Sequence, residues 1–450
     1  MGLWAAAAEQ LRRWRRAGRA GAPPPSPPTP ASPSPSSTAT ALQPRRKLEQ
    51  QEWYFGVWPR VQASRRLKKD GNFLCRLTLD AEGVETLVVS AMAEGEVVHC
   101  PVNISLDHQK NRRYAFDGKT YDSVYSLVAG YIAEGTPVNK GSNVVLSKGV
   151  RRPEFCLRHK DVEERELVGP AAYGGSSEVF LGRFAKGSGP KDSQLLSVLL
   201  KKSSGDAGDE ERSMVVDEAK ALHHLHNPKH CDLVLSLHGL CSDKLPMVLI
   251  LEDWGKPLPA FLKANKGMPP AKRLALSKEL ARALEYLEEK NMVHRNLRSS
   301  AVQAEGTRVK VGELSWAVEG PTWRDAGKTE PPFYPAGGAR WAAPELMDSG
   351  QFSTASDLWA MAVVVWEVCS GGERPWGPAT DQQIQAKLAA GEKLSLPDTA
   401  PAELSDLLSR AWEPIAMSRP SPAEFAAALH RLCLPKDNND NNYQPMPDTN

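Results

Sequence analysis

Two groups of residues in this sequence have side chains that suit phosphate chemistry. Arg76 is the single charge in the apolar run GNFLCRLTL. Its planar guanidinium can hold two phosphate oxygens at once, which a lysine cannot do; a structural salt bridge is the plainer interpretation. The second group is Lys201 in SVLLKK, Glu218 in VVDEAKAL and the glycine-rich run 169–179. Glycine lets a backbone approach phosphate closely. The alternative for Lys201 is a purely structural lysine that stabilises its own part of the domain.

The apolar pattern predicts the strands and helices that position these residues. The runs 71–79 and 85–93 predict strands, and residues 122–135 predict a helix. Further on, a leucine stripe predicts a helix over 278–290. Residues 357–369 are apolar on nearly all faces, which predicts a helix buried within a large domain. Two more strand-like runs are 197–202 and 247–252.

Changes in composition predict the organisation of the chain. We expect a disordered basic and proline-rich segment over 1–50, a first domain over 51–146 and a linker over 147–163. A second domain is expected over 164–433, followed by a disordered tail over 434–450.

The bulk composition is typical of a reduced, cytoplasmic globular protein. The formal net charge of +2 argues against a nucleic-acid-coating protein. The seven cysteines are dispersed without a C-x-x-C pair, as expected for free thiols. No run is apolar over the length that spans a bilayer, and the N-terminus has neither a signal-peptide core nor, at Ala6, the hydroxyl residue of a myristoylation signal.

The N-terminal segment leaves several interpretations open. Its first twenty residues carry five arginines and a single acid, Glu9. This composition fits a solvated basic tail, a membrane-surface helix that gives peripheral contact, or a mitochondrial presequence. Residues 22–43 are mostly Pro, Ser, Thr and Ala, which favours an extended linker, with docking to an SH3-type polyproline groove as the alternative.

The motifs EWYFG, PRVQASRRL and GNFLCRLT, in this order, resemble the opening of SH2 domains (W-Y-x-G, R-x-x-A-x-x-L-L, F-L-V-R-E-S). The resemblance implies an α+β fold, with a central antiparallel sheet flanked by two helices, that binds tyrosine-phosphorylated proteins. It places Arg76 at the base of the phosphate pocket and Arg60 against the phosphotyrosine ring. It also implies that Thr78 supplies the hydroxyl of the phosphate-binding loop and that His99 supports the pocket. Two departures from the pattern, Cys75 and Leu77, remove no phosphate donor.

Three later segments resemble tyrosine kinases: EYLEEKNMVHRNLRSSAV, ARWAAPELMDSGQFSTASDLWAMAVVVWEV and AWEPIAMSRPS. With the linker EFCLRHKDVEERELVG, the whole looks most like the Fes/Fer group of cytoplasmic kinases, which implies a bilobal kinase-like domain after the SH2 domain. The resemblance implies structural roles for Glu345, Asp357 and Arg419. It implies nucleotide-binding roles for Gly169, Gly174, Gly175, Lys201 and Glu218.

The kinase pattern is altered where the reaction takes place. Asn296 stands where the catalytic aspartate is expected, and a neutral amide cannot accept the substrate's proton. Ala301 replaces the metal-binding asparagine, and Ser177 replaces the last glycine of the phosphate loop. Glu313, in the D-F-G position, can still bind Mg²⁺, but its carboxylate lies one methylene further out. We therefore expect impaired phosphoryl transfer, while ATP and Mg²⁺ binding stay open.

Two tyrosines are candidates for phosphorylation. Tyr334 lies between the altered D-F-G segment and the A-P-E motif, and Tyr443 lies in the tail sequence NNYQPMP. Phosphorylated Tyr443 could engage an SH2 pocket in the same chain or in another protein, and an unmodified tyrosine is the alternative.

Two functions follow from these patterns. The favoured hypothesis is a phosphotyrosine-binding signalling protein whose kinase-like domain acts as a scaffold or modulator. The alternative is an active non-receptor tyrosine kinase that transfers the γ-phosphate of ATP to protein tyrosine.

Overall fold

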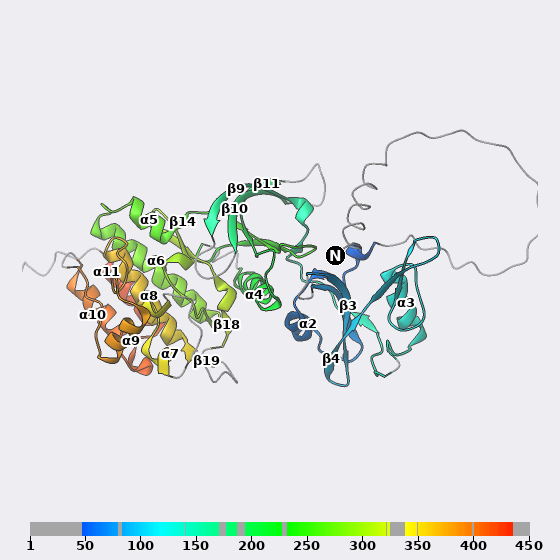
Figure 1. Ribbon diagram of the computed structural model, residues 1–450. Helices are drawn as coiled ribbons and strands as arrows, with labels where there is room; N and C mark the ends of the chain where they lie inside the picture. Colours follow the sequence, from blue (N-terminus) through cyan, green and yellow to red (C-terminus); the bar gives the residue numbers. More distant parts are fainter. Residues whose placement is uncertain are drawn as a thin grey trace, which may run out of the picture. The chain divides into compact units, whose positions relative to one another are not determined.

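The computed structural model describes residues 47–434 apart from nine short stretches (Figure 1). Those stretches are residues 80–82, 140, 171–176, 187–193, 227–231, 321, 325–337, 349 and 398–399. Among the described helices, none combines the length and apolar character needed to cross a membrane.

The first part of the described chain is built on a sheet with strand order β1-β2-β3-β4. Strand β1 pairs with β2 in parallel, and the other two pairs are antiparallel. The strands are β1 (Tyr54–Val57), β2 (Asn72–Leu79), β3 (Glu85–Ala93) and β4 (Glu96–Pro101), followed by the hairpin β5 (Asn103–Leu106) and β6 (Arg112–Ala115). The helices are α2 (Arg60–Arg66) and α3 (Val124–Glu134).

Strand β2 sends alternate side chains to two separate cores, as the pleat of a strand requires. Phe73 and Cys75 pack with the buried face of α3, in a core that includes Leu127. Leu74 instead belongs to a core that includes Ala63 of α2. Arg76, two residues after Leu74, therefore faces the α2 side of the sheet.

The next part of the chain forms a six-stranded sheet with order β8-β12-β13-β11-β10-β9, as far as the described residues show. It carries one long helix, α4 (Asp209–Leu225), whose buried residues include Val216 and Leu222. The strands are β8 (Cys156–Leu157), β9 (Val162–Pro170), β10 (Glu178–Lys186), β11 (Gln194–Lys202), β12 (Leu237–Cys241) and β13 (Val248–Glu252).

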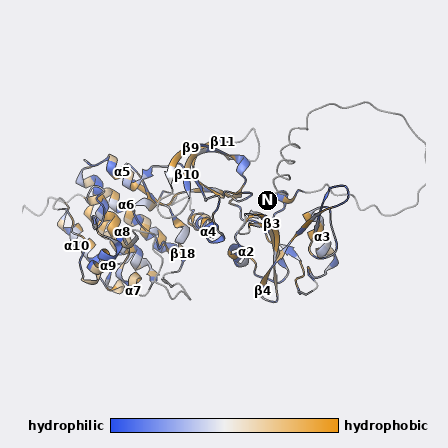
Figure 2. Cartoon of the chain, viewed as in Figure 1, coloured by the Kyte–Doolittle hydropathy of each residue, from blue (hydrophilic) through white to orange (hydrophobic). Residues whose placement is uncertain are grey.

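The following part is mainly helical and is organised around α8 (Thr354–Cys369). Residues 356–369 are all buried, and Figure 2 shows apolar colouring on this helix and its neighbours. A capping box between Ser353 and Ser356 satisfies backbone groups at its start. The other helices are α5 (Leu258–Ala264), α6 (Pro270–Glu289), α7 (Pro344–Asp348), α9 (Asp381–Ala389), α10 (Ala402–Ala411) and α11 (Pro422–Leu432).

Short elements complete the described structure. The strands are β14 (Lys256–Pro257), β15 (Met292–Val293), β16 (Val302–Glu305), β17 (Arg308–Val311), β18 (Val318–Glu319), β19 (Thr322–Arg324) and β20 (Gln351–Ser353). The 3₁₀ turns are η1 (Leu48–Gln50), η2 (His159–Asp161), η3 (Ser299–Ala301), η4 (Leu314–Trp316), η5 (Gly338–Arg340) and η6 (Ala416–Ser418).

The segment predicted to be a linker takes part in both large sheets. Strand β7 (Lys148–Gly149) pairs in parallel with β2, and β8 pairs in parallel with β12. His159 then fixes the end of this segment, because its backbone N–H donates to the Asp243 carboxylate at 3.1 Å and its Nε2 lies 2.8 Å from the Pro246 carbonyl oxygen. These pairings give the segment a defined path between the sheets.

Candidate functional site

Arg76 is a buried cation at the centre of the first candidate site. Its side chain is only 3% exposed. Nε donates to the Ser90 hydroxyl at 3.1 Å, and Nη1 donates to the Trp58 carbonyl at 3.2 Å. These two bonds fix the plane of the guanidinium, so the arginine is oriented before any ligand arrives.

His99 of β4 joins the same group through Ser90. The two residues are partners across β3 and β4, and His99 Nδ1 lies 2.8 Å from the Ser90 hydroxyl oxygen. Burial, followed by the charges of Arg76 and Arg60, lowers the pKa of His99 to about 4. The ring is therefore neutral at pH 7, and Nδ1 can accept the proton of the hydroxyl that accepts from Arg76.

Ser90 is the residue of this site that the sequence reasoning missed. It is fully buried on β3, in the apolar stretch VVSAMA. A buried hydroxyl needs a partner, so a serine in an apolar run indicates that some polar group lies beside it. The sequence does not show the strand register that makes Arg76 and His99 those groups.

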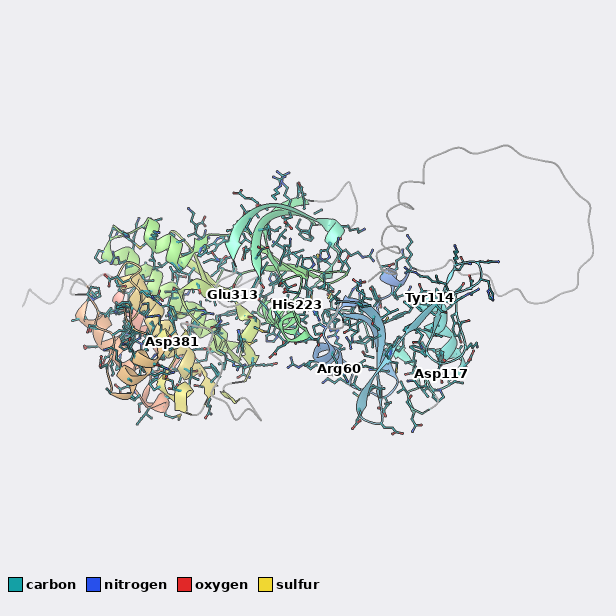
Figure 3. The ribbon with its side chains drawn as sticks, viewed as in Figure 1. Arg60, Tyr114, Asp117, His223, Glu313 and Asp381 are labelled. Atoms are coloured by element: carbon teal, nitrogen blue, oxygen red, sulfur yellow. The ribbon has the colours of Figure 1, made fainter. Side chains whose placement is uncertain are left out.

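Arg60 and Thr78 lie around this pair. Arg60 is the exposed first residue of α2 (Figure 3), and its charge acts on both Arg76 and His99. Thr78 is half-buried on β2 opposite Thr86, and by alternation it shares the face of Arg76. The structure thus provides two guanidinium groups and a hydroxyl on the α2 side of the sheet, with a charge that suits an anion.

Lys201 is the centre of the second candidate site. Its Nζ donates to Glu218 Oε2 and to Glu313 Oε2, each at 2.9 Å. Burial alone would lower the pKa of Lys201, but the two carboxylates outweigh it and hold that pKa above its usual range. The bonds connect β11, α4 and the chain just before η4. Figure 3 labels Glu313 at this position.

Glu313 has an uncommon backbone conformation, with φ of 56° and ψ of 45°. This left-handed geometry is unfavourable for a residue with a Cβ. The same residue makes the contact with Lys201. Ala301 lies nearby, because its carbonyl accepts from the Gly312 N–H at 2.8 Å. An alanine offers no side-chain ligand for a metal, so Glu313 is the remaining oxygen ligand at these two positions.

Most of the predicted phosphate loop lies outside the described residues. Gly169 is near the end of β9 with a φ of 151°, and Ser177 is buried at the start of the next strand. Gly174 and Gly175 fall within the stretch that the structure does not describe.

The segment around Asn296 is held by backbone bonds to a buried carboxylate. Asp357 of α8 accepts the N–H groups of His294 and Arg295 at 2.6 and 3.0 Å. Burial raises the pKa of Asp357 to about 7. His294 is also buried, with a pKa lowered to about 4 by that burial, so its neutral Nδ1 can accept the Asn296 N–H at 3.3 Å.

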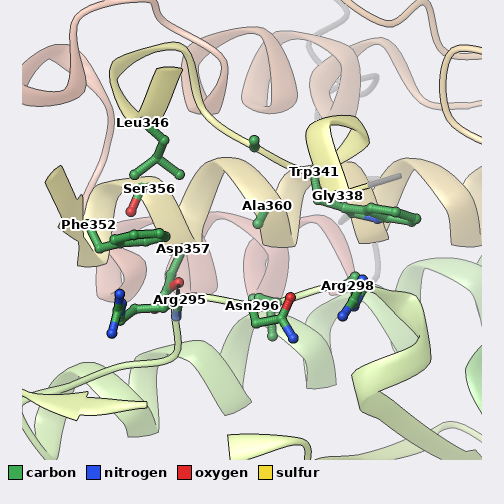
Figure 4. A pocket seen from close by; sticks show the side chains of 12 residues that line it. Arg295, Asn296, Arg298, Gly338, Trp341, Leu346, Phe352, Ser356, Asp357 and Ala360 are labelled. Carbon is green, nitrogen blue, oxygen red and sulfur yellow. Dashed lines mark hydrogen bonds between the residues drawn. The ribbon is translucent and has the colours of Figure 1, made fainter. Parts of the chain in front are cut away.

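Asn296 lines a small cavity (Figure 4). The guanidinium of Arg295 stacks on Phe352 at 4.4 Å from the ring centre, and Arg298 and Trp341 lie along the other side. The amide of Asn296 can donate or accept a hydrogen bond there, but it has no basic group for taking up a proton.

Two further contacts hold the surrounding scaffold. Arg419 donates to both carboxylate oxygens of Glu345, each at 2.7 Å. Glu367 of α8 accepts from the Ser299 hydroxyl and from Trp341 Nε1, each at 2.7 Å. Glu367 therefore ties the segment after Asn296 to the chain before α7.

These two sites, one on each sheet, correspond to an SH2 domain followed by a protein kinase fold. The family model for the SH2 domain matches residues 53–131. The model for protein tyrosine and serine/threonine kinases matches residues 164–429, more than half of the chain. The protein therefore belongs to the protein tyrosine and serine/threonine kinase family, with an SH2 domain before the kinase domain.

Comparison with individual proteins finds relatives of the Fer/Fps group. The chain is 28% identical to the human tyrosine-protein kinase Fer over 388 residues, covering 85% of this chain and 44% of that protein. It is 26% identical to the Fps transforming protein of avian sarcoma virus (strain PRCII), covering 84% and 67%. It is 24% identical to Fer-related kinase 1 of Caenorhabditis elegans, covering 80% and 87%. The chain thus spans less than half the length of human Fer.

The burial of Glu367 predicts a pH dependence of stability. Burial raises the pKa of Glu367 from 4.5 to about 7. Between these values the folded protein keeps a proton that the unfolded chain releases, so this residue makes the folded state less stable as pH rises from about 4.5 to 7. We expect Glu367→Gln, which stays neutral, to gain up to about 3 kcal/mol relative to wild type across this window.

Urea denaturation of both proteins at several pH values measures this difference. It should grow from pH 5 to pH 7 and then level off. A difference that is independent of pH would contradict a neutral, buried Glu367.

Proposed function

We propose that this protein is a phosphotyrosine-binding signalling protein whose kinase domain is impaired in phosphoryl transfer and acts as a scaffold or modulator. The observation that carries the first half is the buried Arg76, oriented by Ser90 and Trp58 and accompanied by the exposed Arg60. A preoriented guanidinium with a second cation beside it suits a phosphate dianion. The binding partners are accordingly tyrosine-phosphorylated proteins.

The second half of the proposal rests on the groups that would touch the reactants. Asn296 cannot act as a base, which typically costs a factor of ~10²–10⁴ in rate. Ala301 supplies no metal ligand, so a bound Mg²⁺ would depend on Glu313. Glu313 in turn is engaged with Lys201. These side chains favour a kinase fold that has kept its scaffold and lost reactive groups.

An active tyrosine kinase is the second candidate, and the Lys201–Glu218 pair favours it. This pair positions nucleotide phosphates in active kinases, and here its atoms are 2.9 Å apart. Glu313 could still hold Mg²⁺ at its oxygens, and the metal would neutralise charge on the transferred phosphate. Human Fer, a related protein, bears the name of a tyrosine-protein kinase.

Three further predictions concern residues outside the described part of the chain. Tyr334 and Tyr443 stay candidates for phosphorylation, and the proline-rich segment stays a candidate for SH3 docking. Cytoplasmic location is proposed from the dispersed cysteines, and peripheral membrane contact from the basic N-terminus.

Phosphotyrosine binding can be tested with Arg76→Lys. Lysine keeps the charge but loses the forked geometry, so we expect affinity for a phosphotyrosine peptide to fall by about tenfold or more. Fluorescence polarisation with a labelled peptide pool, which has phosphotyrosine between random residues, measures this on the full chain.

The matched control is Arg151→Lys, the same change at an exposed arginine with ion pairs of 3.8 and 4.0 Å. It should bind as wild type does. Equal binding by wild type and Arg76→Lys, or no preference for the phosphorylated pool, would contradict the proposal.

The role of Glu313 can be tested with Glu313→Gln. The carboxylate lies on the lysine that nucleotide phosphates would approach, so its removal should raise metal-free ATP affinity several-fold through reduced repulsion. If Glu313 is also the metal ligand, Mg²⁺ will strengthen ATP binding in wild type and much less in the variant. Fluorescent-nucleotide titration with and without Mg²⁺ measures both effects.

Glu319→Gln, at an exposed carboxylate six residues on, is the control. If Glu313→Gln shows the same ATP affinity as this control, with and without Mg²⁺, Glu313 has no role in nucleotide or metal binding.

A further inference from the structure

Helix α4 of the kinase domain contacts helix α2 of the SH2 domain through polar side chains. Gln62 Nε2 donates to the Ser213 carbonyl at 3.2 Å and to the Ser213 hydroxyl at 2.7 Å. Arg65 and Asp217 form an ion pair of 3.1 Å. Because α2 begins at Arg60, these contacts bring the start of α4 toward the phosphotyrosine site.

Asp209, the first residue of α4, reaches that site. Its Oδ2 accepts the backbone N–H of Arg60 at 2.9 Å. Its Oδ1 lies 3.8 Å from Arg212 Nη2, within the same helix, and the side chain is 40% exposed. The carboxylate is therefore held in place from both domains while it stays open to solvent.

The charge of Asp209 extends to the residues that orient a phosphate. Burial is the largest influence on the pKa of Arg76 and of His99, and it lowers both. The Asp209 carboxylate acts in the opposite direction on each of them. A group that affects both residues lies near enough to act on a phosphate bound beside them.

We propose that Asp209 places a fixed negative charge, supplied by the kinase domain, at the rim of the phosphotyrosine site and thereby lowers the affinity of the SH2 domain for phosphotyrosine. This inference rests on the proposed binding at Arg76. A phosphate dianion and the carboxylate repel each other, while both are attracted to Arg60 and Arg76.

The same repulsion couples the two domains. If Asp209 weakens phosphopeptide binding, the bound phosphopeptide must weaken the Arg60–Asp209 contact to the same extent. Phosphotyrosine binding then loosens the start of α4, the helix that also carries Glu218 of the nucleotide site.

Asp209→Asn tests the inference on the full chain. Asparagine keeps an oxygen that can accept the Arg60 N–H and removes only the charge. The affinity for the labelled phosphotyrosine peptide pool should rise about three- to tenfold at low salt, and the gain should shrink as salt screens the repulsion. A change of shape alone would not produce this salt dependence.

Asp217→Asn is the matched control, because Asp217 lies on the same helix and pairs with Arg65 of the same α2. It should bind the pool within about twofold of wild type at the same salt. The inference is overturned if Asp209→Asn binds the peptide pool with the same affinity as wild type, or more weakly. It is also overturned if Asp217→Asn gains as much affinity as Asp209→Asn, because that would indicate separation of the two domains. If wild type and Arg76→Lys bind the peptide pool with equal affinity, the proposed phosphotyrosine binding itself is overturned, which is a separate result.

Discussion

The ion-pair cluster of Lys201, Glu218 and Glu313 is the constraint on which the two candidate sites depend. Its bonds join β11, α4 and the segment before η4 around a lysine side chain that is 11% exposed. Removing Lys201 would leave the buried Glu218 without its counter-charge, which costs about 3–5 kcal/mol. Because the cluster fixes α4, it also fixes the helix that contacts α2 and places Asp209 beside Arg60. One network thus holds the residues predicted to bind nucleotide and the rim of the proposed phosphotyrosine site.

The side chains that hold the kinase fold together match the family pattern, whereas several of those expected to touch the reactants differ from it. Two scaffold contacts are present among the described residues: Asp357 holds the backbone of His294 and Arg295, and Arg419 holds Glu345. The altered side chains, Asn296 and Ala301, are those that would meet the substrate hydroxyl and the metal. Asn296 lines a cavity, and Ala301 is buried without a polar side-chain group. Under the proposed function, this fold persists while its reaction is impaired, and it still presents a surface to the SH2 domain.

Much of this architecture could be predicted from the sequence, because it depends on local patterns. The apolar alternation of 71–79 and 85–93 matches β2 and β3, and the apolar run of 357–369 lies within the buried α8. The motifs also singled out Lys201 and Glu218, which are in contact in the structure. Ser90 could not be found in this way, because its role depends on the register of β3 with β4. Asp209 could not either, because its partner is 149 positions away in another domain and no sequence period links them.

The central claim is that a kinase scaffold here lacks the side chains for efficient phosphoryl transfer. The most direct measurement compares ATP/Mg²⁺ phosphotransfer to a generic tyrosine peptide by wild type, by Lys201→Met and by the double variant Asn296→Asp/Ala301→Asn. The account predicts that wild type is no faster than Lys201→Met, while the double variant, with a base and a metal ligand restored, is measurably faster. Wild-type turnover that disappears in Lys201→Met would contradict it and identify an active kinase that uses Glu313 for its metal.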